Sequence, residues 1–158
     1  MQPRLNYAHA FPEGVHAMIQ LERTISGSGL EERLLHMIKT RASQMNGCAY
    51  CIDMHTKDAR AIGETEQRLY ALSAWREAPF FSPRERAALA WTEAITNIQN
   101  GHAPDEVYEE VRREFDEKEL ARLTFAITQI NAWNRLAIGF RVEVGTYQPQ
   151  KQQKTVQV

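Results

Sequence analysis

The spacing of the apolar residues is the feature that most limits how this 158-residue chain can fold. Apolar side chains recur every three or four positions along almost the whole chain, and there is no sustained alternation of β-branched with polar residues. Helices have a period of about 3.6 residues, whereas half-buried strands have a period of two. The sequence therefore predicts an all-α fold.

Glycine, proline and serine signals separate the predicted helices. These helices span about 13–25, 31–45, 48–61, a short segment after Thr65, 82–98, 104–115 and 118–140. The start signals are strongest at Ser82, with Glu85 three residues on, and at Asp116, with Glu119 three residues on, because both pairs fit a capping box. The last helix is apolar around most of its circumference, so we expect it to be central or to lie between subunits.

Length and composition fit one domain. Residues 1–147 are expected to form it, and the polar, Gln- and Lys-rich residues 148–158 are expected to be a flexible tail. The net charge of −1 argues against nucleic acid or an anionic membrane surface as a partner. No apolar stretch approaches the ~18 residues that would span a bilayer, and no signal peptide is evident, so we expect a cytoplasmic protein.

Both cysteines lie within four positions, at Cys48 and Cys51, and His55 follows one helical turn later. At 100° per residue, all three point from one face of a helix within an arc of about 60°. The helix N-terminus stabilises a thiolate at Cys48, and His55 can act as a base beside Cys51. A thiolate that attacks a peroxide becomes a sulfenic acid, which a second cysteine nearby can convert to a disulfide. The spacing predicts a redox site.

Three other interpretations use the same residues. A structural zinc site usually has four ligands, and this helix offers three. Covalent haem attachment requires a histidine directly after the second cysteine, where Ile52 stands, and is excluded. The pair could also be two buried small residues beside a hydrogen-bonded histidine. Zinc and simple burial remain alternatives to redox chemistry.

Other polar residues are more ambiguous. His36 lies opposite the apolar stripe of its helix, near Lys39, so the local pattern predicts a surface histidine. Asn131, Asn134 and Arg135 interrupt the apolar last helix and, if buried, must be hydrogen-bonded, which favours a packing network over catalysis. The remaining histidines are expected to face solvent: His9, His16 and His102.

The segment from Asn46 to His55, within a helical chain of this size, resembles the AhpD-type alkylhydroperoxidases of the carboxymuconolactone decarboxylase superfamily. The resemblance covers about 31–98, and residues 130–135 resemble the closing helix of one branch. It implies an all-α helical bundle that assembles into homo-oligomers, either trimers or hexamers. It also implies an enzyme that reduces alkyl peroxides or hydrogen peroxide.

The resemblance implies roles for individual residues. Cys51 would be the peroxidatic nucleophile, Cys48 the resolving thiol and proton donor, and His55 part of a proton relay. This order reverses the helix-dipole argument, which favours Cys48 as the more acidic thiol. Family members begin the relay with a glutamate at the position of His36. A histidine here would either replace the carboxylate in the relay and move the pH dependence towards neutrality, or leave the activity weak or altered.

The sequence thus predicts a thiol-dependent peroxidase with peroxiredoxin activity. An external dithiol or lipoyl-type reductant would restore its thiols, and neither a bound cofactor nor a metal is implied. Two other functions remain open. One is a decarboxylase or related lactone enzyme, for which a cysteine pair is not needed. The other is a non-catalytic redox or stress-response protein whose disulfide alters its assembly.

Overall fold

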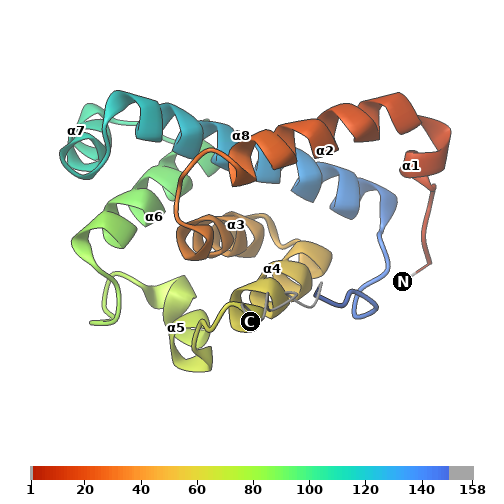
Figure 1. Cartoon of the computed structure of the whole chain (residues 1–158), viewed down its shortest axis with the longest axis horizontal. Coiled ribbons are helices and arrows are strands. Elements are labelled where there is room, and N and C mark those ends of the chain that lie inside the picture. Colours follow the sequence, from red (N-terminus) through yellow and green to blue (C-terminus); the bar gives the residue numbers. More distant parts are fainter. Residues whose placement is uncertain (1, 150–158) are drawn as a thin grey trace, which may run out of the picture.

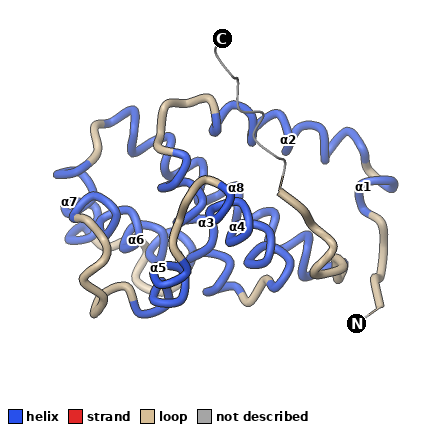
Figure 2. The backbone as a smooth tube through the Cα atoms, turned by 60° about the horizontal axis from the view of Figure 1, so that its bottom comes forward, coloured by secondary structure: helices blue, strands red, loops and turns tan. Residues whose placement is uncertain are grey.

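The computed structural model describes residues 2–149, and every regular element in that range is helical (Figures 1 and 2). The elements are α1 (Tyr7–Ala10), α2 (Pro12–Ser26), α3 (Glu32–Asn46), α4 (Ala49–Ala61), α5 (Glu66–Ala71), the 3-10 turn η1 (Leu72–Ala74), α6 (Pro83–Thr96), α7 (Asp105–Glu114) and α8 (Glu117–Phe140). The all-helical prediction is confirmed, and the long helices begin and end within one or two residues of their predicted ends. The short α1 was not predicted.

Helix α3 lies in the middle of the molecule, with α2 and α8 across one side and α4 on another (Figure 1). It packs against α4, α6 and α8. The polar side chains of Lys39, Thr40 and Ser43 are buried along with its apolar stripe. The prediction that this polar side faces solvent is wrong, because neighbouring helices cover both sides of α3.

Helix α8 is the long helix that connects most of the fold. It packs against α2, α3, α4, α6 and α7, which explains why its apolar residues are distributed around its circumference. Two of them are nevertheless exposed in the protomer, Phe125 at 59% and Ile138 at 45%. The predicted contact between subunits along this helix stays a prediction.

Local capping signals determine where the helices begin. The Ser82 side chain accepts a hydrogen bond from the backbone of Glu85, and the Glu85 carboxylate accepts one from the backbone of Ser82. The Asp116 and Glu119 pair makes the same reciprocal contacts. Both predicted capping boxes are confirmed.

The chain after α8 leaves the helical layer and runs along α4. There the Lys57 ammonium donates a hydrogen bond to the backbone carbonyl of Tyr147, at 3.0 Å. Of the predicted tail, residues 150–158 lie outside the described part of the chain. Within residues 2–149, no helix is both long enough and apolar enough to cross a bilayer.

Candidate active site

The two cysteines lie at the junction of α3 and α4. Gly47 ends α3 with φ of 70°, in the left-handed region that glycine adopts without strain. Cys48 is then the N-cap of α4, and its sulfur accepts a hydrogen bond from the Cys51 N–H. The sulfurs of Cys48 and Cys51 are joined in a disulfide, with a Cα–Cα distance of 5.4 Å. The sequence correctly predicted both the helix start and the proximity of the pair.

The disulfide is buried but lies at the edge of a groove. Cys48 is 1% exposed and Cys51 is 2% exposed. An open groove of about 760 Å³ runs between the start of α4, the end of α8 and the following segment. Its lining includes Cys48, Tyr50, Ile138 and Val142, and among the described residues it does not include Cys51. The disulfide is therefore approached from the Cys48 side.

His55 and His36 meet between α4 and α3. Their ring centroids are 5.8 Å apart. The side chain of His55 is buried, and that of His36 is only 16% exposed. The prediction of a surface histidine at position 36 is wrong, because α4 packs against this side of α3. The structure thus joins Cys48 to Cys51 and places His36 against His55, while Cys51 and His55 lie one turn apart on the same face of α4.

Both histidines are held neutral. Burial lowers the pKa of His55 well below its usual value, and the charges of Lys39 and His36 lower it further. Burial also lowers the pKa of His36, where the opposing effect of Asp58 exceeds the lowering effect of Lys39. A neutral imidazole can accept a proton, so both rings are available as bases at neutral pH.

Lys39 is a buried charged residue near the two histidines that the sequence reasoning missed. Its side chain is buried on α3 and forms an ion pair with Glu22 of α2. A buried lysine generally requires such a partner, because a desolvated charge is costly. No local pattern distinguishes it from a surface lysine, since its partner comes from a different helix.

Asp58 is the second residue that was missed. It lies one turn after His55 on α4, and its Oδ1 accepts a hydrogen bond from the Tyr147 hydroxyl at 2.7 Å. The i, i+3 spacing places Asp58 and His55 on the same face of α4 and could have revealed that the two side chains lie near each other. The contact with Tyr147 could not be predicted, because it depends on the path of the chain after α8.

An asparagine network connects α3 to α8 beside this site. The Asn46 amide donates to the side-chain oxygens of Asn131 and Asn134, at 2.9 and 2.8 Å. Asn134 in turn donates to the Ser43 hydroxyl at 3.0 Å, and Arg135 donates to the backbone and side chain of Asn131. The predicted packing network is confirmed, and it lies within the protomer.

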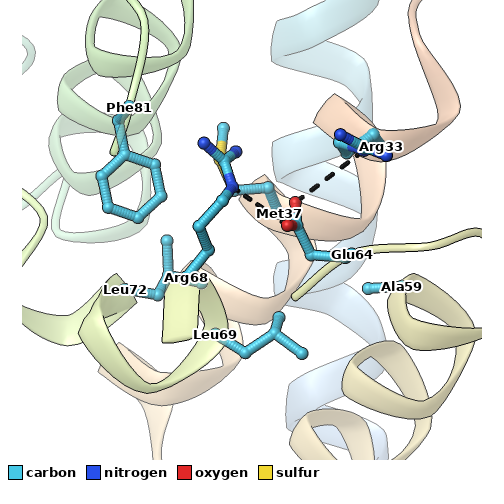
Figure 3. Close-up of a pocket in the computed structure, with 8 residues that line it drawn as sticks. All are labelled: Arg33, Met37, Ala59, Glu64, Arg68, Leu69, Leu72 and Phe81. Atoms are coloured by element: carbon cyan, nitrogen blue, oxygen red, sulfur yellow. Dashed lines mark hydrogen bonds and ion pairs between the residues drawn. The ribbon is translucent and has the colours of Figure 1, made fainter. Parts of the chain in front are cut away.

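A separate pocket near α5 has a structural role (Figure 3). Its lining includes Arg33, Glu64, Arg68 and Phe81. The Arg68 guanidinium lies beside Phe81 and pairs with Glu64 at 3.0 Å. The space inside is about 10 Å³, which holds roughly one water molecule. The pocket is therefore too small for a substrate.

The remaining histidines of the sequence lie elsewhere. His9, His16 and His102 are all exposed, as predicted. They belong to α1, α2 and the loop before α7, and the structure does not bring them to the cysteines.

Comparison with known proteins assigns the chain to one family. The family model of the carboxymuconolactone decarboxylase family matches residues 12–94. An uncharacterized protein of Bacillus subtilis (strain 168), YdfG, is 49% identical over 138 residues, which cover 87% of this chain and 94% of YdfG. The matched region begins earlier than the resemblance in the sequence suggested, because it includes α2.

Solved structures give the same result. A protein of unknown function from Agrobacterium tumefaciens, described as a candidate antioxidant defence protein AhpD, has a TM-score of 0.89 and 45% identity, over 92% of this chain and 100% of that chain. The debrominase Bmp8 shares the fold, with a TM-score of 0.77 and 21% identity over 85% of this chain and 73% of that chain. This chain belongs to the carboxymuconolactone decarboxylase family, in its AhpD-like branch.

Proposed function

We propose that this protein is a thiol-dependent peroxidase that reduces alkyl peroxides or hydrogen peroxide. The observation that carries the proposal is the placement of the Cys48–Cys51 disulfide at the start of α4, with His55 one helical turn after Cys51 and His36 against His55. The dithiol form of such a pair supplies the two electrons that reduce a peroxide and becomes the disulfide, and a neutral imidazole supplies the base that a thiol requires to react.

In the oxidative half of the cycle, His55 accepts the proton of the Cys51 thiol, directly or through water. The thiolate attacks one peroxide oxygen, the O–O bond breaks, and the alcohol or water leaves with a proton. Cys51 is then a sulfenic acid. Cys48 attacks this sulfur, the S–O bond breaks, and water leaves as the disulfide forms. His36 passes protons between His55 and solvent.

In the reductive half, an external dithiol restores the two thiols. One of its thiolates attacks Cys48, the residue that lines the groove, and the Cys51 thiolate leaves. The second thiol of the donor then attacks the mixed disulfide, so the donor becomes a disulfide and Cys48 becomes a thiol. This order leaves Cys51 beside His55, ready for the next peroxide.

Peroxide consumption with excess dithiothreitol tests the proposal. The wild-type protein is expected to turn over, and C51S to lose activity. C48S is expected to form a sulfenic acid without an intramolecular disulfide. H16A changes an exposed histidine far from the site and serves as the matched control. Turnover by C51S at the wild-type rate would refute the role of Cys51.

Two alternatives give different results in the same preparations. A lactone decarboxylase, as the family's description suggests, would act on a muconolactone acid and stay active when both cysteines are serine. A non-catalytic redox protein would oxidise once, without turnover, and change its oligomer size. Size-exclusion chromatography before and after oxidation measures that change and also tests the proposed trimer or hexamer.

A further inference from the structure

We propose that His36, His55 and Asp58 bind a divalent transition-metal ion, Zn²⁺ by preference, at a site that needs neither cysteine. One ligand atom from each of these side chains lies within 4.8 Å of the other two. Two imidazoles and one carboxylate form a ligand set suited to Zn²⁺ with an open fourth position for water. The proposal does not rest on the peroxidase function.

The required movement is small. Tetrahedral bonds of about 2.0–2.2 Å place neighbouring ligand atoms roughly 3.4 Å apart. The ligand atoms must therefore approach one another by at most about 1.4 Å, which side-chain rotations can supply. Asp58 and His36 are half-buried and give the ion a route from solvent, whereas His55 forms the buried end of the site.

Unpartnered nitrogens independently indicate a ligand. The Nδ1 atoms of His36 and His55 are both buried, and neither has a hydrogen-bond partner among the described residues. Buried polar atoms in folded proteins almost always have a partner. Two such nitrogens on neighbouring rings indicate that a further group binds to these side chains in the functional protein.

The surrounding contacts also suit an ion. The Tyr147 hydroxyl donates to Asp58 Oδ1 at 2.7 Å, while Oδ2 accepts no hydrogen bond from the described residues, so Tyr147 orients the carboxylate as an outer-shell partner does in metal sites. The nearby cation, Lys39, opposes a divalent ion, but its pairing with Glu22 offsets the charge. Glu32 lies 3.9 Å from His36 Nε2 and adds negative charge on the exposed side.

Binding would block the proton route. An ion that holds the imidazole lone pairs prevents the rings from accepting protons, so Zn²⁺ is expected to inhibit any activity that uses them. The site could thus couple the redox chemistry of the protein to the available zinc.

The test uses Co²⁺ as a visible probe on the full-length protein in its disulfide form, so that no thiolate can act as a ligand. Wild-type protein is expected to bind one equivalent, with the intense visible absorption of a four-coordinate site, and Zn²⁺ should displace it. The variants D58N and H36A are each expected to weaken binding at least 10-fold, and Y147F by about 10-fold. H55A is expected to abolish it.

Matched controls make the result specific. D53N changes another carboxylate on α4, H16A changes an exposed histidine, and the double variant C48S/C51S removes both thiols; all three should bind Co²⁺ as the wild type does. Equal affinity in wild type, D58N and H36A would overturn the proposal, as would the absence of binding by wild type. If H55A does not fold, the variants D58N and H36A, at half-buried positions, still decide whether this site binds the metal. Loss of peroxidase activity in C48S/C51S with Co²⁺ binding intact separates the two proposals.

Discussion

His36 and His55 lie against each other across the contact between α3 and α4, with ring centroids 5.8 Å apart and ring planes tilted by 48°. His55 is buried in the middle of α4, and the side chain of His36 is partly exposed to solvent. The two rings therefore extend from the buried side of this contact to its partly exposed edge. In the peroxidase cycle that we propose, a proton taken from Cys51 leaves through His36.

The variant H36A is expected to lower peroxide turnover and to remove an ionisation from the pH profile. Because the pKa of His36 is lowered by burial, that ionisation should lie below the usual value of 6.5. The wild-type rate should fall as the pH falls through it. Steady-state rates over pH measure this effect, with H16A as the control. An H36A profile identical to that of wild type would mean that His36 takes no part in proton transfer.

The sequence located the cysteines but not the side on which His36 lies. Periodicity and caps depend on neighbours along the chain, so the helix start at Cys48 and the Ser82 capping box were both predicted correctly. His36 appeared exposed because the helical projection of α3 shows one apolar stripe. Its opposite side is covered by polar contacts, such as Lys39 with Glu22 and Ser43 with Asn134, and these depend on where other helices pack.

The variant K39M is expected to raise the pKa of both histidines, because the Lys39 charge lowers the two values. Methionine keeps most of the length and apolar surface of the side chain. Histidine NMR titration measures the shift directly. K118M, on the first turn of α8, is the control and should leave both titrations unchanged. Unshifted histidine titrations in K39M would show that Lys39 acts only through packing.

The stability of the protein is expected to fall in mild acid because of His55. Its pKa in the folded state lies well below 6.5, so the unfolded state binds more protons. Stability is therefore fully present above about pH 6.5 and decreases as the pH falls towards the folded-state value. Urea unfolding at several pH values measures this slope. The variant H55N should have a shallower slope over the same range, and an unchanged slope would assign the effect to other groups.

The variant N134A is expected to destabilise the protein by about 1–3 kcal/mol, because it removes one of the hydrogen bonds of Ser43 and one of those of Asn46. Asn134 is fully buried, so water cannot replace the lost amide without a new cavity. Urea unfolding measures the change. N100A alters an exposed asparagine and should unfold within about 0.5 kcal/mol of wild type. Equal stability of N134A and wild type would mean that the hydrogen bonds of Asn134 make no net contribution to the free energy of unfolding.

The variant E93Q is expected to weaken the contact between α3, α6 and the η1 segment, most clearly above pH 5. Burial alone would raise the pKa of Glu93, but hydrogen bonds from Trp75, Arg76 and Arg41 outweigh it and hold the pKa below the usual 4.5. Its contribution to stability is therefore present above that value and is lost as the pH falls through the lower folded-state pKa.

Glutamine keeps the shape of Glu93 but not its charge, and the two arginines then lack their carboxylate. A loss of about 1–3 kcal/mol is expected at pH 7, together with a smaller decrease in stability below pH 4.5 than in wild type. Thermal and urea unfolding at pH 7 and pH 4 measure both effects, with exposed Glu77 changed in the control E77Q. The substitution removes the interaction of the Glu93 charge with Arg41 and Arg76. The difference in the free energy of unfolding between E93Q and wild type should therefore vanish at a pH where Glu93 is protonated in both the folded and the unfolded state. A difference that persists there would assign the destabilisation to packing rather than to charge.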